Sequence, residues 1–154
     1  MLTQADLAND SQIDLVVCSV RVDKHFLTVK PSIMADKAVF VEWPLDRSLS
    51  LKKCFLSLSQ KHGGKTIVGL QGSFSPVIRK LKEIVEKGDD RGIGKVLSST
   101  IVASVGNGDL TERKNVRYFL DRKVGGNVVS IHFGHSVEWI TSGTYNSLPF
   151  PLYL

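Results

Sequence analysis

The chain has 154 residues, of which 42% are hydrophobic and 23% charged, and its net charge is +5. This length and balance indicate one ordinary soluble domain with a core. No run of 18 apolar residues occurs, so we expect no membrane span, and the first residues lack the basic and apolar regions of a secretory signal.

The cysteines, histidines and basic residues argue against a metal site and against a nucleic-acid-binding surface. The histidines and the two cysteines never fall into a paired metal-binding spacing, so no metal is expected. Cys18, in an apolar run, and Cys54, on a helix face, are expected to be buried free thiols. Basic residues are scattered along the chain, which favours a solvated surface over direct nucleic-acid contact.

Three short apolar runs predict β-strands, at 13–20, 38–43 and 66–70. Each is rich in β-branched residues and is bounded by polar or turn-forming residues. Runs of this kind are typical of parallel strands that are buried on both faces. We therefore expect the three strands to pair in parallel in one sheet.

Helical patterns alternate with these strands. The segment 22–36 carries apolar residues on one face, and Pro31 is expected to kink or split that helix. The segment 48–62 repeats apolar positions and is ended by Gly63-Gly64, and a third helix begins at Ser75-Pro76. This alternation predicts an α/β fold with βαβ crossovers.

The pattern changes after residue 92. The segment 93–104 is β-prone with near alternation, as in an open sheet, and 125–139 predicts a loop that leads into a helix presenting His135. We place a domain boundary here. We expect the first domain, 1–92, to be the C-terminal part of a Rossmann-type parallel sheet, and the second, 93–154, to be the start of an α+β domain, as the family resemblance carried by the segments below implies.

Five segments, in this order, carry a family resemblance. They are 14–25 (DLVVCSVRVDKH), 39–44 (VFVEWP), 68–76 (VGLQGSFSP), 93–97 (IGKVL) and 133–135 (FGH). With them the chain resembles the glucose-fructose oxidoreductase/inositol dehydrogenase-type family. It is more narrowly similar to a non-catalytic branch, the fungal galactose-pathway repressors. The resemblance covers most of the chain and implies the fold more strongly than the activity.

The resemblance also shows what the chain lacks. Enzymes of the family carry Glu-Lys-Pro where this chain has Glu42, Trp43 and a proline, and an aspartate at the position of Ile131. A lysine can polarise a carbonyl or assist proton transfer, whereas an indole offers only a weak N–H donor. Only the histidine of the catalytic set remains, as His135, and we regard it as more structural than catalytic.

Part of a dinucleotide site is implied to survive. The resemblance places Ser19, Val20, His25, Glu42, Trp43 and Gln71 around the nicotinamide-ribose end of NAD or NADP. Two of these have equally plausible structural readings: His25 could brace the start of a helix, and Trp43 could be packing between domains. A carboxylate at the end of a buried strand, such as Glu42, needs a partner.

No Gly-x-Gly-x-x-Gly motif, which would hold the pyrophosphate, occurs in the sequence. We therefore expect a chain truncated at both ends that binds the dinucleotide weakly or not at all. The resemblance implies a transcription-activator protein as partner, a homo-oligomer formed through the C-terminal sheet, and a cytoplasmic and nuclear location.

Three functional hypotheses follow. The first is a repressor-like regulator of galactose metabolism with a degenerate NAD(P) site, and Trp43 and Ile131 favour it. The second is an NAD(P)-dependent oxidoreductase of sugars or polyols that has lost the usual lysine and aspartate. The third is a non-functional fragment of either, which the missing phosphate loop favours.

Overall fold

The computed structural model describes residues 3–87, 97, 98, 100, 102 and 114–141. The chain divides into two compact units, Met1–Gly69 with Thr111–Ile131, and Leu70–Leu110 with His132–Leu154. Each unit is described by itself. The predicted strand at 93–104 lies outside the described residues except for four positions. In the described part, no helix is both long and apolar enough to cross a membrane.

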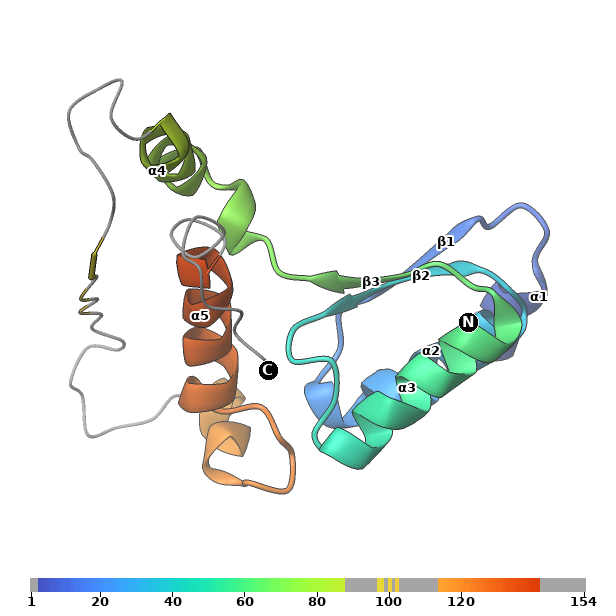
Figure 1. The fold of residues 1–154 in the computed structure, drawn as a ribbon. Helices are drawn as coiled ribbons and strands as arrows, with labels where there is room; N and C mark the ends of the chain where they lie inside the picture. The colour runs from blue at the N-terminus through green and yellow to red at the C-terminus, as the bar shows by residue number, and fades with distance from the viewer. Residues whose placement is uncertain (1–2, 88–96, 99, 101, 103–113, 142–154) are drawn as a thin grey trace. The chain divides into compact units, whose positions relative to one another are not determined.

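The first unit is built on a parallel sheet (Figure 1). Its strands are β1 (Leu15–Cys18), β2 (Ala38–Glu42) and β3 (Thr66–Gly69), in the order β1-β2-β3. Leu15 stands opposite Ala38 and, on the other side of β2, Val39 stands opposite Thr66. The predicted parallel pairing of all three strands is therefore confirmed, with strands somewhat shorter than the apolar runs.

Helices α2 (His25–Met34) and α3 (Leu49–His62) connect these strands and lie along one face of the sheet (Figure 1). The 3-10 turn Val22–Lys24 leads into α2, and a short helix, α1 (Gln4–Asn9), precedes β1. Pro31 does not split α2, which continues past it to Met34. The helix tolerates the lost N–H because its buried face is held against the sheet.

Local caps fix the ends of α3 as the sequence predicts. Ser48 accepts a hydrogen bond from the Leu51 amide at 3.3 Å, and Gly63 ends the helix with a φ of 67°. A left-handed residue costs little only when it is glycine, so the chain turns here toward β3.

The core of this unit lies between the sheet and the two long helices. Its buried members are Cys18, Val29, Ile33, Val39, Val41 and Phe55. The Phe26 ring packs edge-on against that of Phe55, with centroids 5.1 Å apart. Cys54, one position earlier on α3, is exposed, so its predicted burial was wrong.

The opposite face of the sheet corrects another expectation. Leu15, Val17 and Ile67 are 51%, 61% and 55% exposed. Side chains alternate between the two faces of a strand, so these residues share the face away from α2 and α3. The strands are therefore buried on one face in the described structure, and not on both as predicted. A continuous apolar run cannot tell which of its faces is covered.

The second unit is mainly helical in its described part. Helix α4 (Pro76–Lys87) follows the 3-10 turn Gly72–Phe74, and α5 (Gly134–Ile140) continues from a π-helical turn, Val129–Phe133. The amide of Ile78 donates to Ser75 Oγ at 3.3 Å, which confirms the predicted helix start at Ser75-Pro76. A further 3-10 segment, Lys114–Leu120, belongs to the first unit.

Candidate functional site

The candidate site lies at the carboxyl ends of β1 and β2, where parallel sheets bind ligands. Ser19 and Val20 follow β1, and both are exposed. Glu42 is the last residue of β2, and Trp43 follows it. Because β1 and β2 pair in parallel, these four residues stand at the same edge of the sheet.

His25 lies beneath the surface at this edge of the sheet and contacts the two segments that follow β1 and β2. Its side chain is 2% exposed, with Nε2 2.8 Å from the Val20 carbonyl and Nδ1 3.2 Å from that of Leu45. The imidazole thus ties the segment after β1 to the segment after β2. Both ring nitrogens are engaged with backbone, so this side chain presents no polar atom to a ligand here.

The carboxylate of Asp46 lies at the N-terminus of α2, a role that no local pattern predicted. It is 2% exposed and accepts a hydrogen bond from the Phe26 amide, in the first turn of α2, at 3.2 Å. Its other oxygen accepts from the Arg47 amide at 2.6 Å. The free amides of a helix N-terminus can bind a phosphate. At α2 the Asp46 carboxylate accepts the hydrogen bond of one of these amides instead.

Trp43 is fixed by two partners. Its indole Nε1 donates to the Ser130 carbonyl at 2.7 Å, across 87 residues of sequence. The Lys52 ammonium of α3 lies 5.5 Å from the centroid of the indole ring, within cation–π range. The half-buried ring is therefore held between α3 and the loop that carries Ser130.

That loop approaches the segment after β2 very closely. Gly125 has a φ of 81°, and a Cβ there would lie 2.3 Å from Arg47 Cα. Asn127 and Ser130 then cap one another, since the Asn127 amide donates to Ser130 Oγ and the Ser130 amide to Asn127 Oδ1, each at 2.9 Å. This Asn-x-x-Ser spacing is a signal in the sequence from which the capped turn could have been predicted.

Glu42 is exposed, and its carboxylate has no hydrogen-bond or ion-pair partner among the described residues. Its carboxylate acts on Cys18 at a distance. Burial raises the pKa of the Cys18 thiol, a backbone hydrogen bond at Val20 opposes that rise, and the charge of Glu42 adds to it. An exposed carboxylate at the end of a strand can accept hydrogen bonds from a ligand's hydroxyl groups.

The remaining two candidates, Gln71 and His135, lie in the second unit. Gln71 is exposed and begins the 3-10 turn, accepting a hydrogen bond from the Phe74 amide at 3.1 Å. Glu138 of α5 anchors the same turn, because its Oε2 accepts from the Ser73 amide at 3.2 Å. His135 is half-buried on α5, and its imidazole has no hydrogen-bond partner in the part of the chain that the structure describes.

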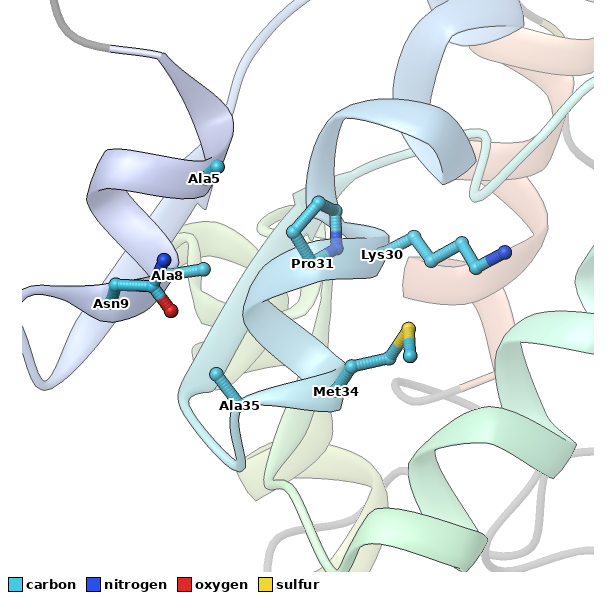
Figure 2. A pocket seen from close by; sticks show the side chains of 7 residues that line it. All are labelled: Ala5, Ala8, Asn9, Lys30, Pro31, Met34 and Ala35. Atoms are coloured by element: carbon cyan, nitrogen blue, oxygen red, sulfur yellow. The ribbon is translucent and has the colours of Figure 1, made fainter.

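An open hollow of about 360 Å³ lies between α1 and α2, away from these residues. Figure 2 shows the side chains that line it: Ala5, Ala8 and Asn9 of α1, Lys30, Pro31 and Met34 of α2, and Ala35 directly after α2. It offers none of the candidate site residues. Among the described residues, no cluster of three or more histidine, cysteine, aspartate or glutamate side chains could hold a metal ion.

Comparison with known proteins shows which proteins this chain resembles. Residues 76–147 match the family model described as "Gal80p, C-terminal domain". The chain is 31% identical over 139 residues to the galactose/lactose metabolism regulatory protein GAL80 of Kluyveromyces lactis, covering 85% of this chain and 30% of that protein. The chain is similar to proteins of the glucose-fructose oxidoreductase/inositol dehydrogenase-type family, and among them to the Gal80p-like branch.

Solved structures agree with this placement. The transcriptional regulator Gal80p from Kluyveromyces lactis superposes with a TM-score of 0.70 at 27% identity, over 90% of this chain and 35% of that one. An NAD binding oxidoreductase from Klebsiella pneumoniae gives 0.51 at 27% identity, over 55% of this chain and 22% of that one. The family's Rossmann-type α/β fold is thus confirmed.

An enzyme-named relative is equally similar. The chain is 29% identical over 153 residues to dehydrogenase aclE of Aspergillus oryzae, covering 94% of this chain and 41% of that protein. Across the first curated relatives, this Gal80p-like chain spans only 30% to 41% of their lengths. Sequence similarity therefore points to both regulators and enzymes, and the residues of the site must distinguish between them.

Proposed function

We propose that this protein is a repressor-like regulator of galactose metabolism, built on an oxidoreductase fold. The observation that carries the proposal is the use made of Trp43. Its only polar atom donates to the Ser130 carbonyl at 2.7 Å, at the position where the family's enzymes carry lysine. That position therefore serves the architecture of the site, and no proton-transferring group stands there.

Ile131, the residue directly after Ser130, supports the same proposal. Ile131 stands where the enzymes carry an aspartate, and its amide donates to the Asn127 carbonyl at 2.9 Å. General acid–base groups typically contribute about 10²–10⁴-fold to a rate. A chain that replaces two of them by an indole and an alkyl group retains a trace of such catalysis at most.

A second candidate function is an NAD(P)-dependent oxidoreductase of sugars or polyols. One observation favours it: the Lys52 ammonium lies 5.5 Å from the centroid of the Trp43 ring, so a lysine does stand near the position of the missing one. The similarity to dehydrogenase aclE is consistent with it. A lysine held over an indole face could polarise a substrate carbonyl if a ligand reached it.

A turnover assay separates the two candidates. With NAD or NADP and either galactose or inositol, we expect the 154-residue chain to produce no NADH or NADPH. We expect none from Trp43→Lys either, because the Ser130 carbonyl, which accepts from the indole in the wild type, would accept from the new ammonium. Production that is robust in the wild type and abolished by Lys52→Met would establish the oxidoreductase. Lys53→Met, one position further along α3, is the matched control.

We further propose a degenerate NAD(P) site. Ser19, Val20, Glu42, Trp43 and Gln71 would contact the nicotinamide-ribose end, with His25 holding the Val20 carbonyl in place. The carboxylate of Glu42, which is exposed and has no partner among the described residues, fits a ribose hydroxyl. The pyrophosphate fits less well, because Asp46 fills the N-terminus of α2 and Ser48 caps α3.

Calorimetry tests this site. Charge-assisted hydrogen bonds contribute roughly 1.5–3 kcal/mol each, so a dinucleotide without two phosphate contacts should bind about 10³-fold more weakly. We expect weak or undetectable binding of NAD and NADP by the chain alone. Fusing the strand, glycine turn and first helix of an NAD-binding relative should restore binding, which Glu42→Ala should then reduce. Micromolar binding by the unfused chain would refute the proposal.

The regulator would act through protein contacts. We propose a transcription-activator protein as its partner, homo-oligomers formed through the domain that begins near residue 92, and a cytoplasmic and nuclear location. A galactose-responsive reporter in a yeast strain that lacks its own GAL80 tests this role. Restored repression by this chain is the expected result, and an unchanged reporter at verified protein levels would contradict it.

A further inference from the structure

The surface of α2 and α3 carries a second hollow, away from the strand ends, which shares only Lys30 with the hollow of Figure 2. It has a volume of about 360 Å³ and lies in the first unit. Its lining is Phe26 and Lys30 of α2 with Lys53, Cys54, Ser57, Leu58 and Lys61 of α3. We call this the α2–α3 groove.

The groove has an apolar floor and a cationic rim. Phe26 and Leu58 are partly buried and pack on the core, so their remaining surface forms the floor. Lys30 lies over the Phe26 ring, with Nζ 6.0 Å from its centroid. Lys30 lines both hollows, and in Figure 2 its side chain extends away from the labelled residues of α1.

The rim charges are arranged along the groove. Lys53, Ser57 and Lys61 are spaced i, i+4 and i+8 on α3, so they follow one another on the same helix face. At 1.5 Å per residue, the two lysine positions are about 12 Å apart along the axis. This spacing fits an elongated ligand better than a single compact anion.

These lysines are unmatched. Neither α2 nor α3 contains an aspartate or glutamate, and no ion pair involving Lys30, Lys53 or Lys61 occurs in the described part of the chain. Helix α4 differs, since its lysines pair with glutamates on the same helix at spacings of three and four. A surface built only for solubility mixes both signs, as α4 does.

We propose that the α2–α3 groove binds an acidic segment of a partner protein that carries apolar side chains. Carboxylates on that segment would meet the three lysines, and an aliphatic or aromatic side chain would cover Phe26 and Leu58. Nucleic acid fits less well, because the floor is apolar and the rim holds no arginine. The proposal uses none of the strand-end residues and is independent of the regulator assignment.

A defined peptide tests the groove. The probe is a fluorescein-labelled 15-residue amphipathic helix with one leucine stripe flanked by glutamates, and its twin has lysine for each glutamate. Fluorescence anisotropy with the 154-residue chain should show saturable binding of the acidic probe only. Absence of binding, or equal binding of both peptides, would overturn the proposal.

Two charge-reversal variants locate the binding. Lys53→Glu with Lys61→Glu should raise the dissociation constant of the acidic probe by about tenfold or more, since two attractions become repulsions. Lys65→Glu with Lys123→Glu changes net charge equally at exposed positions outside the groove and should leave it nearly unchanged. Equal loss in both variants would show bulk attraction and refute a specific groove.

Cys54 gives a readout that needs no variant. Its thiol is exposed in the groove lining, whereas Cys18 is buried. Saturating acidic probe should slow alkylation of Cys54 by maleimide severalfold, and an unchanged rate would refute occupancy of the groove. A duplex DNA of equal charge that displaces the probe and protects Cys54 better than the peptide would assign the groove to nucleic acid and overturn the proposal.

Discussion

Gly125 should be among the least replaceable positions of the first unit. Its φ is 81°, and a Cβ built on it would lie 2.3 Å from Arg47 Cα and 2.5 Å from Arg47 Cβ. Gly63 is a matched control, because its φ is 67° and an added Cβ would meet nothing within 4 Å. Both variants, Gly125→Ala and Gly63→Ala, therefore carry the same backbone penalty, and only one adds a collision.

The expected magnitudes follow from these two contributions. An alanine in the left-handed region costs roughly 1–2 kcal/mol, which is the whole expected loss of unfolding free energy for Gly63→Ala. Overpacking against fixed atoms typically costs a further ~1–3 kcal/mol. At Gly125 the obstacle is backbone and cannot rotate away, so we expect a total loss of about 2–5 kcal/mol.

Urea denaturation followed by tryptophan fluorescence measures the difference. Both variants are made in a Trp139→Phe background, so that emission reports Trp43 in the first unit. With a slope of roughly 1–3 kcal/mol per molar urea, Gly125→Ala should unfold at a midpoint about 1 M below that of Gly63→Ala. Equal midpoints would show that the Gly125 loop does not rest on Arg47, and the description of the site would be wrong.

Three further outcomes are expected. Trp43→Phe should lower the unfolding free energy by about 1–3 kcal/mol, because the Ser130 carbonyl loses its donor, and a loss no larger than for an exposed aromatic would contradict the bond. Cys54 should react with maleimide in the native protein and Cys18 only in urea, as mass spectrometry would show, because burial shields Cys18 and raises its pKa. The lysines one turn away hold the pKa of Glu83 at about 2, below its ordinary 4.5, so its stabilising contribution is present above pH 4.5 and is lost as pH falls toward 2; an NMR titration midpoint near 4.5 would refute this.

Much of the fold could be predicted from local patterns. Apolar runs located the strands, and Ser48, Gly63 and Ser75 marked helix ends because caps are encoded within three or four residues. Failures came where tertiary contacts decide. Pro31 stays within α2 because that helix is held against the sheet, and Val17 is exposed because no helix covers its face in the described structure.

The site was less predictable for a similar reason. The sequence singled out Glu42 and Trp43 at the end of β2, and the structure places both at that edge of the sheet. It gave no sign that Asp46 would fill the N-terminus of α2 or that Lys52 would lie over the indole, since both depend on which loops meet in space. Such pairings span 20 residues for Asp46 and Phe26, and 87 for Trp43 and Ser130.

The replacement of lysine by Trp43 is thus coupled to the loop that receives it. The indole donates to the Ser130 carbonyl, Ser130 Oγ donates to the Gly125 carbonyl at 2.8 Å, and Gly125 rests on Arg47, two residues beyond Leu45. A substitution at one of these residues therefore changes the contacts that hold the others in place. Replacing Trp43 by lysine alone would add an ammonium without the aspartate that accompanies it in the family's enzymes, and would remove the indole that donates to the Ser130 carbonyl. For this reason we expect the single reversion to lower stability without creating catalysis, and the position to be replaceable only together with Ile131.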